Sequence, residues 1–191
     1  MPYYFHISRF VLNKKFIIFI VFLICFFWLS DGLYGVNTEQ SYPPADKEDV
    51  SSIDAMVKEL YESITFPEGK EPDLNRLQSL FTPNAQFIRI TPQGVDKMDV
   101  KSFVASFKGW ITSGRMKSFY ESEISRKAQV WGSIAQVFST YKKGINIKDP
   151  ELMVLGINSI QLYHDGQRWW MSSIVWEDER SDNPIPEKYL R

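Results

Sequence analysis

The feature that most constrains the fold is a change in the spacing of apolar residues along the chain. Between residues 51 and 111, apolar side chains recur every three or four positions, which is typical of helices with one buried face. From Phe119 to Glu177 they alternate with polar residues, which is typical of strands. Helices followed by a long antiparallel meander predict an α+β domain, with the N-terminal helices packed on one face of a strongly curved antiparallel sheet.

Capping residues and turn residues divide this pattern into elements. A helix is expected to begin near Ser51 and another after Asp99, because side chains of both types cap helix N-termini. Asp165-Gly166, between two aromatic-rich runs, is a strong hairpin signal. The predicted helices lie within 51–64, 72–81 and 99–113, and the predicted strands cover 85–91, 119–124, 134–138, 152–163 and 168–177.

The N-terminus has the order of an export segment. Arg9, Lys14 and Lys15 precede Phe16 to Leu29, an uncharged apolar run. This order predicts a signal peptide over residues 1–32. The run is shorter than the roughly 20 residues that span a bilayer, and an uncleaved membrane anchor stays open as the alternative. Either way we expect an extracytoplasmic protein, periplasmic or secreted, with a linker at 33–50 and one domain at 51–191.

Composition excludes several classes of function. The chain has 22 basic and 23 acidic residues, a net charge of -1, which gives no general affinity for nucleic acid. Its single cysteine, Cys25, lies inside the apolar run, so we expect no disulfide in the domain. Of the two histidines, His6 lies in the export segment and His164 at the predicted hairpin turn. We therefore expect no metal site and no Ser-His-Asp triad. The sequence has neither a Gly-rich phosphate loop nor a dinucleotide-binding fingerprint, so we also expect no cofactor.

Several segments carry a family resemblance. The segments Gly156–Leu162, Asp165–Trp170 and Ser173–Glu177 are similar to the last hairpin of nuclear transport factor 2-like (SnoaL-like) domains. Phe81–Ala85 and Pro184–Leu190 agree with that resemblance. It implies a cone-shaped α+β barrel with a pocket between helices and sheet, commonly a homodimer. The superfamily includes isomerases, cyclases, dehydratases, epoxide hydrolases and binding modules, so the fold alone does not decide the function.

The resemblance also implies positions for a pocket. Isomerases of the superfamily use a helix tyrosine, an acid donor and a carboxylate base, and the matching positions here are Tyr61, Asn158 and residues 89–91. Residues 89–91, where the base would lie, include no carboxylate, and the only charged residue among them is Arg89. This argues against ketosteroid-isomerase-like catalysis and leaves the catalytic residues unknown.

The hairpin supplies the remaining pocket candidates. A three-residue turn at Asp165–Gln167 would pair residues whose numbers sum to 332, so that Asn158 faces Ile174. Alternation then places Asn158 on one face with Trp170 and Trp176, whereas a two-residue turn would separate them. The pocket candidates are Tyr61, Asn158, Trp176, Trp170 and Arg89.

Two acidic residues fall outside this set. Glu121 and Glu123 share one strand face; they are either an acid/base pair or, in the interpretation we favour, part of a solvated face. Arg89 is a candidate to pair with one of them across the sheet.

Two functions remain. One is a module that binds a small apolar molecule or acts through its dimer, and the other is a cyclase, dehydratase or isomerase acting on a small hydrophobic substrate. A carboxylate or histidine inside the pocket would favour the enzyme. We expect a homodimer, because strands with aromatic residues on both faces, such as Trp169 beside Trp170, leave apolar surface uncovered.

Overall fold

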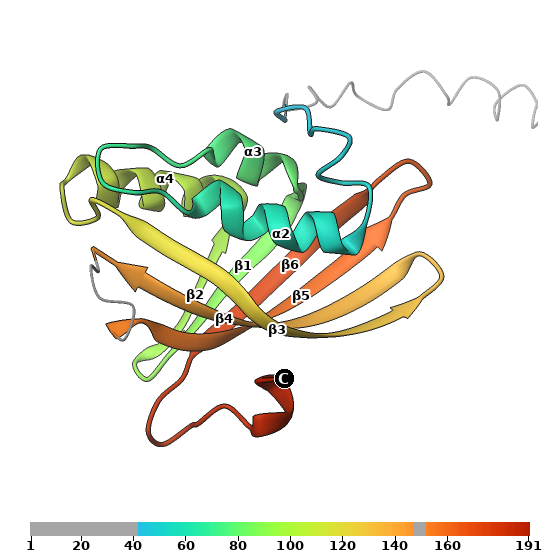
Figure 1. The fold of residues 1–191 in the computed structure, drawn as a ribbon. Coiled ribbons are helices and arrows are strands. Elements are labelled where there is room, and N and C mark those ends of the chain that lie inside the picture. Colours follow the sequence, from blue (N-terminus) through green and yellow to red (C-terminus); the bar gives the residue numbers. More distant parts are fainter. Residues whose placement is uncertain (1–41, 147–151) are drawn as a thin grey trace, which may run out of the picture. The chain divides into compact units, whose positions relative to one another are not determined.

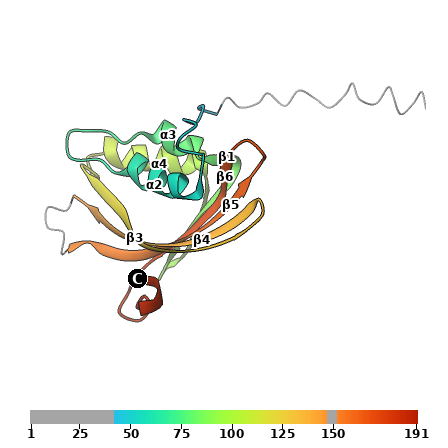
Figure 2. The same cartoon turned by 45° about the vertical axis from the view of Figure 1, so that its right-hand side comes forward.

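Helices cover one face of a curved sheet in the computed structural model, which describes residues 42–146 and 152–191 (Figures 1 and 2). The predicted export segment lies outside the described residues, as does the first half of the predicted linker, residues 33–41. Within the described part, no helix is both long and apolar enough to span a bilayer. The elements are α2 (Ile53–Ile64), α3 (Leu74–Ser79), β1 (Phe81–Thr91), β2 (Gly94–Asp99), α4 (Val100–Thr112), β3 (Phe119–Trp131), β4 (Ile134–Ile145), β5 (Val154–His164), β6 (Trp169–Asp178) and the short 3-10 helix η2 (Glu187–Tyr189).

The helices begin at side-chain caps. Ser52, one residue after the predicted start, accepts a hydrogen bond from the Ala55 amide at 3.1 Å and caps α2. Asp99 accepts one from the Ser102 amide at 2.7 Å and caps α4, as predicted. Each cap satisfies a backbone N–H that the first turn of a helix leaves without a partner.

The six strands form one mixed sheet in the order β2-β1-β6-β5-β4-β3. The α+β class and the strongly curved sheet under the helices are confirmed, but two details differ from the prediction. The sheet is not entirely antiparallel, because β1 pairs with β6 in parallel. The sheet also does not close into a barrel, since β2 and β3 form its two edges.

Irregular pairing interrupts three of the strand pairs. Register shifts occur in β1 between Phe81 and Gln86, in β3 between Glu123 and Ser125, and at the Gln161–Leu162 step of β5. An extra residue in one strand bends it and increases its local twist. These shifts therefore help to curve the sheet around the core between its concave face and α2, α3 and α4.

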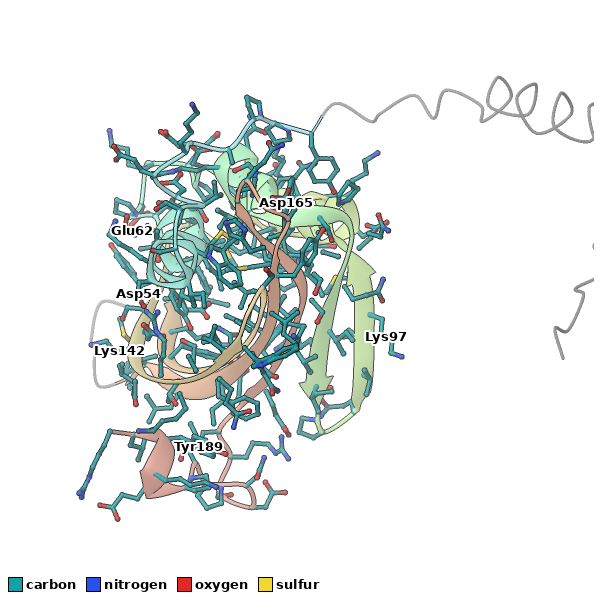
Figure 3. The ribbon with its side chains drawn as sticks, turned by 90° about the vertical axis from the view of Figure 1, so that its right-hand side faces the viewer. Asp54, Glu62, Lys97, Lys142, Asp165 and Tyr189 are labelled. Atoms are coloured by element: carbon teal, nitrogen blue, oxygen red, sulfur yellow. The ribbon has the colours of Figure 1, made fainter. Side chains whose placement is uncertain are left out.

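The opposite face of the sheet carries the C-terminal segment. Thr140 on β4 donates a hydrogen bond to the Tyr189 carbonyl at 2.6 Å, and the Phe138 and Tyr189 rings lie 5.6 Å apart. Figure 3 shows Tyr189 on the side of the sheet away from α2, where Asp54 and Glu62 are labelled. The helices and the C-terminus thus occupy opposite faces.

The last residues of the predicted linker have contacts of their own. Val50 is buried, and its carbonyl accepts a hydrogen bond from the Trp169 amide at 3.0 Å. Asp49 is also buried and accepts two hydrogen bonds from Arg76, each at 2.7 Å. The packed part of the domain therefore includes Asp49 and Val50.

Candidate functional site

A cavity of about 510 Å³ lies between the concave face of the sheet and helices α2 and α4. Its walls are mainly aromatic and aliphatic, and Phe103 of α4 lies edge-on to Trp176 of β6 with 6.2 Å between ring centroids. The polar and charged residues among its lining are Arg89, Asp96, Lys97, Ser106, Glu121, Lys143 and Asn158. A cavity with this composition suits a small, mostly apolar molecule with a polar group.

Strand register brings several of these residues into one row. Paired residues in a sheet point to the same face, and Asn158 of β5 pairs with Ser139 of β4 on one side and Trp176 of β6 on the other. Trp176 pairs in turn with Arg89 of β1, which pairs with Asp96 of β2. The row therefore carries side chains from five strands toward the helices.

Glu121 supplies a carboxylate within the cavity. It pairs with Lys143 across β3 and β4, and its Oε1 accepts a hydrogen bond from Asn158 Nδ2 at 3.3 Å. Burial raises the pKa of Glu121 to about 7, while the nearby positive charge of Lys143 opposes the rise. Lys143 itself lies 2.5 Å from Asp178 Oδ1.

A chain of hydrogen bonds leads from Glu121 through the core. Asn158, 4% exposed, donates to the Tyr61 hydroxyl at 3.1 Å, and that hydroxyl lies 2.6 Å from Ser139 Oγ. Ser139 donates to Glu123 at 2.6 Å. Burial first, and then the negative charge of Glu121, raises the pKa of Tyr61. Four elements, α2, β3, β4 and β5, contribute to this network.

The structure brings together some of the predicted pocket residues and separates others. Asn158, Trp176 and Arg89 line the cavity. Tyr61 lies behind Asn158, bonded to it but outside the cavity lining. Trp170 is on the opposite face of the sheet, where its Nε1 donates to Asp165 at 2.7 Å.

Hairpin geometry explains the different position of Trp170. The loop between β5 and β6 has four residues rather than three, and Ser172 is an extra residue in β6. Asn158 therefore faces Trp176 directly, not Ile174. The extra residue reverses the alternation near the hairpin, so that Trp169 packs against the core and Trp170 points outward.

Charged residues account for the other differences. The interpretation of Glu121 as part of a solvated face is wrong, because Glu121 lines the cavity. Glu123 is an ion-pair partner of Arg126, at 2.6 Å. Arg89 pairs with neither glutamate and lies 4.0 Å from Asp178.

Sequence reasoning also missed Lys143, which was expected in a loop although β4 extends to Ile145. A signal for Glu121 was present: it follows Phe119 by two positions and so lies on the same strand face as that buried ring.

Comparisons with known proteins agree with this architecture. A structure of a nuclear transport factor 2-like protein of unknown function from Silicibacter pomeroyi is 14% identical, covering 68% of this chain and 94% of its own, with a TM-score of 0.48. One from Pseudomonas aeruginosa is 11% identical, covering 65% and 91%, with a TM-score of 0.47. The chain is thus similar in fold to structures that are described as nuclear transport factor 2-like.

A solved structure with an assigned activity also resembles the chain. A hexachlorocyclohexane dehydrochlorinase from Novosphingobium barchaimii is 10% identical, covering 56% of this chain and 73% of its own, with a TM-score of 0.45. No family model and no curated protein matches the sequence. At such identities the likeness extends to the fold alone and does not decide the function.

Proposed function

We propose that the protein binds a small, largely apolar molecule in the cavity between α2, α4 and the sheet, with the molecule's polar group at Glu121 and Asn158. The observation that carries this proposal is the placement of a carboxylate and a buried amide at the wall of an otherwise mainly apolar cavity. Aromatic walls provide binding energy through burial, and a few polar groups fix the ligand's orientation.

The cost of keeping Glu121 in this place supports a role in binding. A carboxylate loses hydration when it is buried, which is why its pKa is raised to about 7. An apolar residue at position 121 would avoid that cost and extend the apolar wall. A ligand that hydrogen-bonds to the carboxylate would recover part of the lost hydration energy.

Binding can be tested with 2-naphthol as a probe and a matched pair of substitutions. Ile174 lines the cavity, and Ile157 lies on the outer face of the neighbouring strand. We expect Ile174→Phe to weaken binding at least tenfold, because the larger ring occupies cavity volume, and Ile157→Phe to leave it within twofold. Isothermal titration on the full-length chain measures both. Absence of binding to the unmodified protein, or equal losses in the two variants, would contradict the proposal.

Proton transfer by Glu121 is a second candidate function. A carboxyl group with a pKa near 7 holds and releases protons at neutral pH, as a general acid or base must. Its test is solvent deuterium incorporation at a C–H position of a bound ligand, followed by NMR. We expect exchange in the unmodified protein and its loss in Glu121→Gln, with Glu62→Gln, on the exposed side of α2, as the control. Exchange that persists in Glu121→Gln would exclude this role.

Export and dimerisation remain proposals. Export is supported by the sequence of residues 1–32. A homodimer is supported by an outer-face row that pairs Trp131, Ile134, Tyr163 and Trp170 across four strands, in which Trp131 is 81% exposed. Cell fractionation tests export, and a full-length chain in the cytoplasm would contradict it. Light scattering at micromolar concentration tests the homodimer, and a monomer would contradict it.

A further inference from the structure

In the hydrogen-bond network behind the cavity, the ion pair of Glu123 with Arg126 determines which group donates and which accepts at each step. Arg126 donates hydrogen bonds to both carboxylate oxygens of Glu123, at 2.6 Å to Oε2 and 3.0 Å to Oε1. An ionised carboxylate only accepts hydrogen bonds. Ser139 Oγ, 2.6 Å from Glu123 Oε1, must therefore use its single proton to donate to that oxygen.

The same reasoning continues inward to the cavity wall. The Ser139 proton is already committed, so at 2.6 Å the Tyr61 hydroxyl must donate to Ser139 Oγ. The Tyr61 oxygen then accepts from Asn158 Nδ2 at 3.1 Å. The other Nδ2 hydrogen is directed at Glu121, 3.3 Å away. Rotating the amide by 180° would place its oxygen against the Glu121 carboxylate, an arrangement of two acceptors.

This direction determines what the polar wall offers to a ligand. Both N–H groups of Asn158 and the O–H of Tyr61 have partners within the protein. The remaining hydrogen-bonding capacity at this position belongs to acceptor oxygens of Glu121 and Asn158. Lys143, beside Glu121, directs one of its three N–H donors at Asp178 Oδ1, 2.5 Å away. A ligand's carbonyl or ether oxygen placed against Glu121 and Asn158 would face acceptors.

We propose that the cavity selects molecules that present a hydroxyl or N–H donor to Glu121 and Asn158, and discriminates against molecules whose only polar atom is a carbonyl or ether oxygen. This inference rests on the proposed binding function and specifies its ligand class. A site built to hydrogen-bond a donor rejects an analogue that lacks the donor, because the site's acceptors then stay unpaired. The network gives Tyr61, Ser139 and Glu123 a positioning role: they hold the Asn158 amide in its orientation.

A pair of probes with the same ring system tests this inference. At pH 8 the unmodified full-length chain should bind 2-naphthol about tenfold more tightly than 2-methoxynaphthalene, the size of effect expected for a hydrogen bond to a charged acceptor. In Glu121→Gln the new amide supplies a donor, and the ratio should fall to threefold or less. The ratio should also fall in the unmodified protein as the pH is lowered through 7 and Glu121 gains a proton, with Lys143 and Asp178 as its charged neighbours.

Tyr61→Phe tests the positioning role. Without the hydroxyl oxygen, one N–H of Asn158 loses its acceptor and becomes free to turn toward a ligand. We expect the naphthol preference to fall to threefold or less in Tyr61→Phe. Tyr120→Phe is the control. Tyr120 precedes Glu121 in β3 and pairs with Gly144, and its substitution should leave the naphthol preference unchanged. If Tyr61 had only a structural role, the substitution would weaken the binding of both probes equally and leave the ratio of their affinities unchanged.

The outcomes separate the two proposals. If neither naphthalene binds, the proposed function fails and this inference fails with it. If both bind with equal affinity to the unmodified protein, binding stands and the selectivity is overturned. A tenfold ratio that persists in Glu121→Gln would also overturn the inference, because the discrimination would then arise elsewhere in the cavity.

Discussion

Replacing Gly156 with alanine is expected to lower the free energy of unfolding by about 3 kcal/mol, the upper end of the usual cost of overpacking a core. A Cβ atom at this position would overlap the ring carbon and hydroxyl oxygen of Tyr141 and lie 2.7 Å from the Glu177 carbonyl oxygen. Tyr141 is fully buried and donates to Asp178 at 2.6 Å, so it has no room to move aside.

Gly109→Ala is the matched control, since a Cβ added at Gly109 would have no atom within 4 Å beyond its chain neighbours and the backbone of α4. Alanine favours a helix interior over glycine by up to about 1 kcal/mol. We therefore expect the same substitution to stabilise the protein at one position and destabilise it at the other. Urea unfolding measures both changes, and a shift of the same sign in the two variants would show that the close approach at Gly156 is relieved by movement of β4 or β6.

The second large effect is expected for Arg76→Ala. Arg76 lies 2.7 Å from Asp49 Oδ1 and 2.6 Å from Glu59 Oε2, and both carboxylates have less than 10% of their side-chain surface exposed. Glu59 Oε1 is buried without a hydrogen-bond partner among the described residues. Removing the guanidinium leaves two buried carboxylates without their cation. We expect a loss of about 3 kcal/mol at pH 8, the lower end for a broken buried pair, because Arg76 is itself 40% exposed.

The effect of Arg76→Ala should depend on pH in a defined direction. Burial, followed by the negative charge of Asp49, raises the pKa of Glu59 to about 7, above its ordinary value of 4.5. The folded state therefore holds more protons on Glu59 than the unfolded state between these values, and this residue's contribution to stability falls as the pH rises from 4.5 to 7. The positive charge of Arg76 lowers the pKa of Glu59, so removing Arg76 raises that pKa further. The contribution of Glu59 to stability then continues to fall at higher pH.

The difference in stability between Arg76→Ala and the unmodified protein should therefore be smaller at pH 5 than at pH 8. Urea unfolding at the two pH values measures it. Lys58→Ala is the control, because it removes a cation from an exposed ion pair between Lys58 and Glu62 of α2. It should change the free energy of unfolding by less than about 0.5 kcal/mol. Equal losses for Arg76→Ala at pH 5 and pH 8 would contradict the account of Glu59.

The three helices and five of the six strands that the structure describes could be predicted because local patterns determine them. The apolar stripes and the Asp99 cap are encoded within single elements, and α4 begins where its cap indicates. Strand β2 was missed for a physical reason: it is an edge strand that pairs only with β1, and most of its residues are exposed. An edge strand of this kind has no alternation of buried and exposed residues that a sequence pattern can reveal.

The site was predicted less completely because it depends on register and on neighbouring strands. The extra residue Ser172 leaves no signature in the alternation, yet it exchanges the faces of Trp169 and Trp170. The alternation that placed Glu121 beside buried Phe119 does not show that a helix covers this part of β3. Whether a strand face meets solvent or a cavity is decided by elements distant in the sequence.

The position of β6 determines the order in which the domain can be completed. This strand lies in the middle of the sheet, between β1 and β5, although it is the last strand in the chain. The hairpin of β1 and β2 joins the other strands through β6 alone, by pairs such as Phe87 with Ile174 that are separated by most of the domain's sequence. Such distant pairings form slowly, because a long loop must close before they contribute energy. During synthesis the two parts of the sheet therefore stay unjoined until residues 169–178 have left the ribosome.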